Sequence, residues 1–172
     1  MNKLYILKNM GFSIPWKLIA VGLFGKDEIP PSITQSDTVE FLKDSLTDND
    51  DQTENIIKLI CAEDDPSEFD GILKALAEED ITDLVIQKRK WRACLLAIII
   101  ENTNKDPLQG MLELTEFWVA MGMPSDCPQA FPNSGDQKAI QHFFTKASYE
   151  SSVNENRAWL SKEILSIINS EL

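Results

Sequence analysis

The single histidine, His142, and the three cysteines are the residues best suited to nucleophilic or metal chemistry. A Ser-His-Asp triad would have to use His142 as its base, and no serine or cysteine at a telling spacing accompanies it. Cys61, Cys94 and Cys127 form neither a CxxC pair nor a Cys/His set with zinc-ligand spacing. We therefore interpret His142 as a structural or surface residue and expect no catalytic residue, no metal site and no cofactor.

An acidic run, Asp48-Asn49-Asp50-Asp51-Gln52, has the composition of a calcium loop. An EF-hand loop that starts at Asp48 needs glycine at its sixth position and glutamate at its twelfth, where this chain has Thr53 and Leu59. The seven glycines form neither a dinucleotide-binding GxGxxG motif nor a P-loop. The sequence therefore predicts no EF-hand and no phosphate-binding loop.

The basic cluster Lys88-Arg89-Lys90-Trp91-Arg92 contains an aromatic residue. Nucleic-acid binding would stack Trp91 on a base and place the neighbouring cations on phosphates. However, Trp91 shares a helical face with Leu84, Leu95 and Ile98, which predicts a buried indole. We interpret the basic side chains as a solvated face that pairs with acidic residues of the same chain.

Two runs of consecutive carboxylates, Glu63-Asp64-Asp65 and Glu78-Glu79-Asp80, have the residue types of a general acid–base pair. Such a pair needs burial to separate the pKa values of its two members. Both runs fall at predicted helix ends and turns, where water screens the charges. We therefore expect no hydrolase and, more generally, no enzyme.

The net charge of −12 disfavours nucleic acid and anionic membranes as partners, because both repel a polyanion. The acidity is local: residues 27–83 hold 18 Asp and Glu against three lysines, a net charge of −15. We expect this surface to attract a basic partner. The alternative is a generally acidic surface with carboxylates that favour helix N-termini. The acids gather in three predicted turns, and the candidate partner-binding residues are Asp48, Asp50, Asp51, Glu54, Glu63, Asp64, Asp65, Glu68, Glu78, Glu79, Asp80 and Asp83.

Apolar residues recur at helical spacing along most of the chain, between short polar turns, and almost no segment alternates with the period of a strand. The sequence therefore predicts an all-α fold, an irregular bundle of seven or eight helices that forms one domain over residues 1–172. Three prolines between residues 123 and 135 predict a long loop or arm. The expected helices cover 13–24, 36–46, a segment around 56–60, a segment that starts at 65–67, 82–101, 107–121, 137–146 and a last segment from 151 or 152.

Polar residues at the expected helix starts supply candidate N-terminal caps. Asp106 followed by Pro107 has the order preferred at a helix start, and Gly122 suits the end of the same helix. The expected caps are Ser13, Ser67 in a capping box with Asp70, Asp106, and Ser151 or Ser152. In an up-and-down bundle alternate turns lie at the same end, so the first and third acidic turns should lie together and the second opposite.

No stretch approaches the roughly 20 apolar residues that a membrane span requires. The apolar run near residue 5 is too short for a signal-peptide core. Cys61 and Cys94 each fall within an apolar helical pattern, where a reduced thiol acts as a small hydrophobe. We expect a cytoplasmic protein that is a monomer or a weak homodimer and binds neither nucleic acid nor membrane.

Several short segments together resemble a bacterial all-helical family of unknown function whose members are small and acidic. Proteins of this character recur among the immunity proteins of contact-dependent inhibition and polymorphic toxin systems. The chain departs from the family pattern at Trp118-Val119, where a tyrosine context is usual, and at 128–132. The resemblance implies no catalytic residue. The segments that carry it are Trp16-Lys17 with Gly22-Leu23, Lys90-Trp91-Arg92, Asp106-Pro107-Leu108, 117–124, and Trp159-Leu160 with Glu163.

These observations favour a non-catalytic immunity or antitoxin-like inhibitor that binds a cognate toxin through its acidic surface. The toxin would be basic, with a nuclease domain as the clearest case, and its Lys and Arg groups would pair with the carboxylates instead of with phosphates. The alternative is a helical adaptor or regulatory module that binds a protein in an apolar groove, which we expect near residues 123–135.

Overall fold

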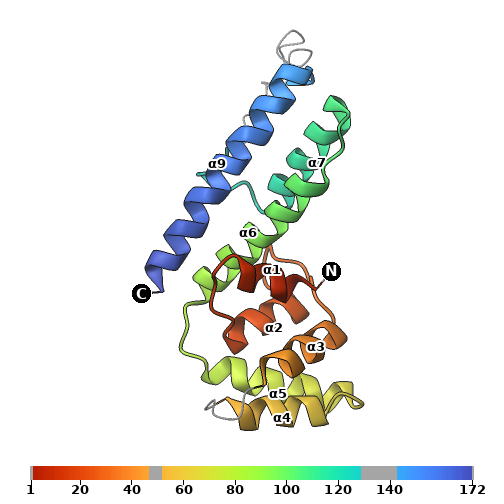
Figure 1. Ribbon diagram of the computed structural model, residues 1–172, viewed down its shortest axis with the longest axis vertical. Helices are drawn as coiled ribbons and strands as arrows, with labels where there is room; N and C mark the ends of the chain where they lie inside the picture. The colour runs from red at the N-terminus through yellow and green to blue at the C-terminus, as the bar shows by residue number, and fades with distance from the viewer. Residues whose placement is uncertain (1, 47–51, 129–142, 172) are drawn as a thin grey trace. The chain divides into compact units, whose positions relative to one another are not determined.

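The structure is a computed structural model, and it describes residues 2–46, 52–128 and 143–171. The described residues form helices, turns and loops and contain no strand. One isolated β-bridge pairs Lys26 with Ile29. This confirms the predicted all-α fold (Figure 1). The described helices are α1 (Lys3–Asn9), α2 (Trp16–Phe24), α3 (Gln35–Ser45), α4 (Thr53–Cys61), α5 (Pro66–Glu79), α6 (Leu84–Asn102), α7 (Pro107–Ala120) and α9 (Lys146–Ser170).

The chain forms two compact units, residues 1–91 and 92–172, and the boundary falls within α6. The single domain expected over residues 1–172 stays a prediction. None of the described helices combines the length and apolar character needed to cross a bilayer.

The first unit consists of short helices. Some of them pack against the next helix in the chain and others against a more distant one. Helix α2 packs against α5, while α3 packs against both α1 and α4. Each of the helices α1 to α5 buries at least two apolar side chains, as an amphipathic helix does. These side chains include Leu4 and Leu7, Leu18 and Ile19, Phe41 and Leu42, Ile56 and Leu59, and Phe69 and Leu73.

A close contact in the first unit joins α2 to Trp91 of α6. The Trp91 side chain is fully buried, and its Nε1 donates a hydrogen bond of 2.8 Å to the carbonyl oxygen of Leu18. The indole lies directly on Gly22, where a Cβ atom would come within 2.1 Å of Trp91 Cζ2. Only glycine fits at this position, because any side chain would have to displace the largest buried ring of the unit.

The second unit is held by contacts between α7 and α9 and between α9 and the later part of α6. Trp118 is fully buried, and its Nε1 donates a 2.7 Å hydrogen bond to Asn156 Oδ1. Arg92 forms an ion pair of 3.1 Å with Glu163 and lies over the Trp159 ring, 5.0 Å from its centroid. These contacts give the Trp118 indole N–H and the Arg92 charge partners inside the unit, although Arg92 Nε itself is buried without a hydrogen bond.

Two helices of the first unit start at other residues than the sequence predicts. Helix α2 begins at Trp16 and not at Ser13, because Pro15 occupies the cap position without a side-chain hydrogen bond. Helix α5 is capped by Asp65, which accepts from the N–H groups of Ser67 and Glu68, so the predicted Ser67 cap is wrong. Asp65 precedes the proline, and a proline at the first helical position favours that register.

The last helix is longer than its sequence predicts. Helix α9 starts at Lys146 with Thr145 as its cap, so the expected start at Ser151 or Ser152 is wrong. By contrast, Asp106 caps α7 as predicted, and Gly122 follows that helix with a φ of +73°. The expected helix 137–146 and much of the expected loop 123–135 lie outside the described residues.

Replacing Gly22 by alanine should destabilise the protein by about 1–3 kcal/mol, because the new methyl group overlaps the Trp91 ring. Urea unfolding followed by circular dichroism measures the change. The matched control is Gly71→Ala in α5, where a Cβ meets nothing within 4 Å, and it should raise stability by roughly 0.5–1 kcal/mol through helix propensity. Equal unfolding midpoints for Gly22→Ala and the wild type would refute the close contact.

Candidate protein-binding surface

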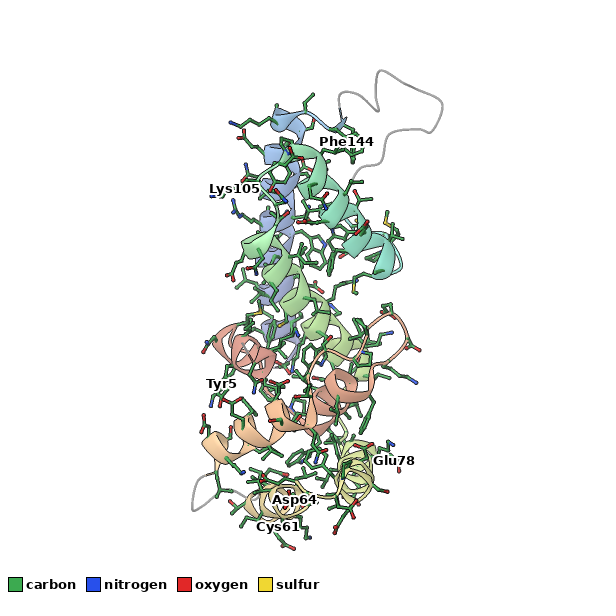
Figure 2. All side chains as sticks on the ribbon, turned by 90° about the vertical axis from the view of Figure 1, so that its right-hand side faces the viewer. Tyr5, Cys61, Asp64, Glu78, Lys105 and Phe144 are labelled. Carbon is green, nitrogen blue, oxygen red and sulfur yellow. The ribbon has the colours of Figure 1, made fainter. Side chains whose placement is uncertain are left out.

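Nine of the twelve predicted partner-binding acids lie in the described part of the chain, all in the first unit. Asp48, Asp50 and Asp51 lie outside the described residues, as does His142. The described nine fall at the ends of α4 and α5 and just before α6. Figure 2 labels Asp64 and Glu78, which are both exposed.

Helices α4 and α5 run antiparallel, joined by the four residues 62–65. The start of α4 and the end of α5 therefore lie together, and Asn55 and Glu79 line one cavity. Glu63, Asp64, Asp65 and Glu68 lie at the opposite end. Since α5 has 14 residues, the two ends are separated by about 21 Å along its axis. The described acids therefore form two groups along one helical pair.

Two members of these groups make exposed ion pairs within the chain. Glu54 pairs with Lys58 at 2.7 Å one turn along α4, and the hydrogen bond from Lys58 lowers the pKa of Glu54. Glu63 pairs with Lys43 of α3 at 2.6 Å. Exposed pairs of this kind contribute only about 0–1 kcal/mol, so a partner's cation can replace the lysine at little cost.

Asp80 has a structural role that its sequence neighbours lack. Its carboxylate accepts hydrogen bonds of 2.8 Å from the backbone N–H groups of Lys17 and Thr82. Lys17 Nζ also donates to the carbonyl oxygens of Asp80 and Thr82. Burial, the largest single effect, opposes ionisation of Asp80, but the hydrogen bonds from Thr82 and Lys17 and the Lys17 charge outweigh it and lower the pKa. Asp80 thus ties the end of α5 to the start of α2.

Asp65 and Asp83 are also used locally. Asp65 caps α5, and Asp83 accepts a 2.8 Å hydrogen bond from the N–H of Val85 at the start of α6. Four acids remain whose side chains make no hydrogen bond or ion pair within the described part of the chain, and all four are exposed: Asp64, Glu68, Glu78 and Glu79. These four are the carboxylates available to a partner.

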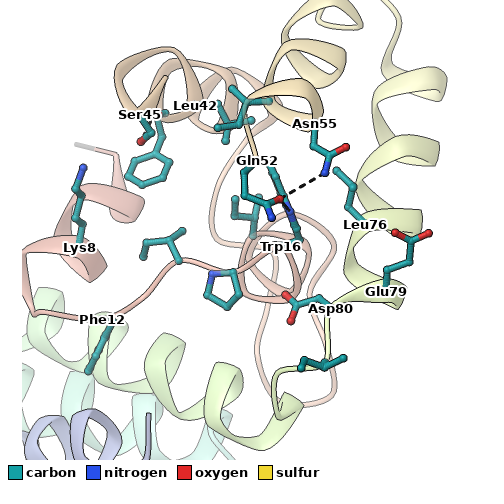
Figure 3. Close-up of a pocket in the computed structure, with 16 residues that line it drawn as sticks. Lys8, Phe12, Trp16, Leu42, Ser45, Gln52, Asn55, Leu76, Glu79 and Asp80 are labelled. Carbon is teal, nitrogen blue, oxygen red and sulfur yellow. Dashed lines mark hydrogen bonds between the residues drawn. The ribbon is translucent and has the colours of Figure 1, made fainter. Parts of the chain in front are cut away.

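A cavity that the sequence did not predict opens beside the second group of acids. It has a volume of about 680 Å³ and lies among α1, α2, α3, α4 and the end of α5 (Figure 3). Its lining combines buried apolar side chains, such as Phe41 and Leu42, with polar side chains, such as Gln52 and Asn55. Ile81, which is 99% exposed, lies on its lining. The one hint in the sequence was this isolated isoleucine among the acids of 78–83, because the other lining residues come from five separate helices and from the segments between them.

The basic cluster is used inside the molecule rather than presented to solvent. Lys88 pairs with Glu28 at 3.0 Å and Asp27 at 3.1 Å, and its hydrogen bonds to Glu28 and Asp27 raise its pKa. Lys90 is fully buried and donates two 2.9 Å hydrogen bonds to Ser13, so the predicted solvated face is wrong at this position. Trp91 is buried, as its helical spacing predicts, and its ring therefore cannot stack on a base.

The sequence predicts that two of the three cysteines lie on apolar helical faces, and the structure shows that they differ in burial. Cys94 is buried as expected, but Cys61 is exposed at the end of α4, so that prediction is wrong. No group of three or more His, Cys, Asp or Glu side chains that could hold a metal ion occurs in the ranges that the structure describes.

A comparison with known families gives a match along most of the chain. The model of a family described as "Uncharacterized protein conserved in bacteria (DUF2247)" matches residues 4–164. The chain belongs to this family. No curated protein and no solved structure matches it. The match confirms a bacterial family of unknown function, and the immunity role of this DUF2247 protein stays a prediction.

The segments that carried the family resemblance are structural in this DUF2247 protein. Gly22 and Trp91 form the close helix contact, and Lys17 holds Asp80. Arg92 and Glu163 form the ion pair of the second unit. These residues therefore make contacts that hold the fold, and Trp16, from the first of the segments, also lines the cavity.

Replacing Asp80 by alanine should cost about 1–3 kcal/mol of stability at pH 7, because two backbone N–H groups lose their acceptor. Glu78→Ala is the control and should stay within about 0.5 kcal/mol of the wild type.

The destabilisation should also depend on pH. Because the folded-state pKa of Asp80 is lowered, its contribution is present above the ordinary value of 3.8 and is lost as the pH falls below it. Urea unfolding at pH 7 and pH 3 tests this, and a difference that persists undiminished at pH 3 would contradict the role of the charge.

Proposed function

We propose that this DUF2247 protein is a non-catalytic inhibitor of the immunity-protein type, which binds a basic toxin domain, such as a nuclease, in the bacterial cytoplasm. The α4–α5 pair would be the docking surface. The observation that carries the proposal is that the side chains of Asp64, Glu68, Glu78 and Glu79 are exposed at the two ends of this pair and have no partner among the residues that the structure describes.

The spacing of these carboxylates suits one protein partner. A standard interface buries about 800 Å² on each side, which is a patch nearly 30 Å across, and the two acidic ends are about 21 Å apart. One basic domain can therefore contact both ends at once. Its lysines and arginines would form charge-assisted hydrogen bonds with the carboxylates and would no longer be free for phosphates.

The local excess of negative charge supports the same conclusion. A net charge of −15 within 57 residues destabilises a compact state through self-repulsion. The electric field of such a surface also raises the rate of association with a cationic partner by orders of magnitude at low salt. A protein that must neutralise a toxin before it acts benefits directly from that rate.

Reversing two charges at one end should slow association with the partner. We expect Asp64→Lys/Glu68→Lys to lower the association rate constant about tenfold at 50 mM NaCl, and the difference should shrink at 500 mM, where the Debye length is only about 4 Å. Stopped-flow or surface-plasmon measurements with the protein encoded by the neighbouring upstream gene provide the test.

The matched control is Glu101→Lys/Glu116→Lys, which makes the same change in net charge at exposed positions of the second unit. It should change the rate about twofold or less. Equal slowing by both double variants would show that general acidity, and no particular surface, is responsible. If the protein encoded by the upstream gene does not bind, or binds with an affinity that does not depend on salt, the proposal is refuted.

A further inference from the structure

The cavity in the first unit has an apolar floor and a polar edge. The floor consists of side chains that are almost fully buried: Phe12, Ile19, Phe41, Leu42 and Ile56. Trp16 and Leu76 form half-buried walls, and the exposed Ile81 extends the apolar surface outward. Apolar pockets of a few hundred cubic ångströms are the size that ligand side chains and small molecules occupy.

The polar groups at the edge are satisfied by one another. Trp16 Nε1 donates a 2.7 Å hydrogen bond to Gln52 Oε1, which also accepts from Asn55 at 3.4 Å (Figure 3). No buried side-chain atom that lacks a hydrogen-bond partner lines the cavity in the part of the chain that the structure describes. A site for a polar small molecule would present such converging, unsatisfied groups, so an apolar group is the better occupant.

The charges at the edge are arranged with opposite signs on opposite sides. Lys8 lies on one side, 5.7 Å from the centroid of the Phe41 ring. Glu79 and Asp80 lie on the other side (Figure 3). Asp80 is occupied by Lys17 and Thr82, whereas Glu79 makes no hydrogen bond or ion pair within the described residues. The unused charge at the α5 side is therefore negative.

We propose that this cavity binds an apolar side chain from a protein segment in which a neighbouring lysine or arginine pairs with Glu79. The inference rests on the proposed function in one respect, since it identifies the segment as part of the basic toxin. An apolar anchor in a pocket with a polar rim is the arrangement found at interface positions that dominate affinity. The surrounding carboxylates then select a cationic neighbour for the anchor.

The first experiment uses synthetic peptides and NMR. The probe is an acetylated, amidated 12-residue peptide of leucine and lysine at helical spacing, titrated into ¹⁵N-labelled protein. It should shift the indole N–H signal of Trp16 at the cavity edge and leave that of the buried Trp118 unchanged. A twin with glutamate for lysine and a twin with serine for leucine should each bind about tenfold more weakly or worse.

Two matched pairs of variants locate the site. Ile81→Arg should weaken binding of the lysine peptide about tenfold, while Ile57→Arg, which is exposed but away from the cavity, should change it less than about twofold. Glu79→Gln should weaken binding about threefold or more, and Glu78→Gln less than about twofold. The second pair removes the same charge from adjacent positions, so it separates local pairing from long-range attraction.

Several results would overturn the inference. Equal binding of the glutamate twin would refute the role of Glu79, and equal binding of the serine twin would refute the apolar anchor. If the wild type sediments as a dimer and Ile81→Arg as a monomer, the occupant is a second copy of this chain. If Ile57→Arg weakens binding as strongly as Ile81→Arg, the peptide binds elsewhere.

Measurements with the upstream gene product separate this inference from the proposed function. If Asp64→Lys/Glu68→Lys slows association but Ile81→Arg leaves the Kd unchanged, the inhibitor proposal stands and the cavity proposal fails. If the peptide results hold but no basic partner binds, the cavity is a protein-segment site and the inhibitor proposal fails.

Discussion

The Trp91 indole occupies the space that any side chain at position 22 would need, and the first unit depends on this contact. It fixes the start of α6 on α2, and the hydrogen bond from Trp91 to Leu18 sets the rotation of α2. With α2 in place, Trp16 reaches Gln52 at the start of α4, and Lys17 reaches Asp80 at the end of α5. Helices α2, α4 and α5 all line the cavity, so the contact between Gly22 and Trp91, 69 positions apart in sequence, holds one wall of the cavity in place.

Eight acids of residues 27–83 fall into two classes by what their side chains contact. Asp37, Asp65, Asp80 and Asp83 each accept hydrogen bonds from backbone N–H groups at helix ends, where a carboxylate also favours the helix dipole. Asp64, Glu68, Glu78 and Glu79 extend into solvent. Composition alone treats these residues as equivalent. Because the first class stabilises the fold and the second only adds repulsion, a partner is the natural explanation for the second class.

The sequence predicted the elements whose pattern is local and missed those decided by distant contacts. Helix α6 and the Asp106 cap of α7 follow from apolar spacing and from a favourable residue order within a few positions. The seven-residue α1 was missed, because one pair of leucines in so short a segment is not a periodic pattern. Lys90 looked like part of a solvated face, and only the approach of Ser13 from 77 residues away explains its burial. Asp80 and Glu79 could not be told apart from the sequence either, because only Asp80 contacts the distant Lys17.

The acidic ends and the apolar cavity favour binding through different physical effects. Exposed carboxylates act over roughly a Debye length and so govern the rate of encounter and the choice of a cationic partner, but exposed ion pairs add little affinity. An apolar hollow acts only on contact, where burial of hydrocarbon contributes about 25 cal/mol per Å². A surface with carboxylates alone would attract many polycations weakly, and a hollow alone would bind apolar side chains without regard to charge. Glu79 lies on the lining of the cavity. In the proposed complex, the segment that binds there must therefore carry both an apolar side chain and a neighbouring cation, and this double requirement is a basis for specificity.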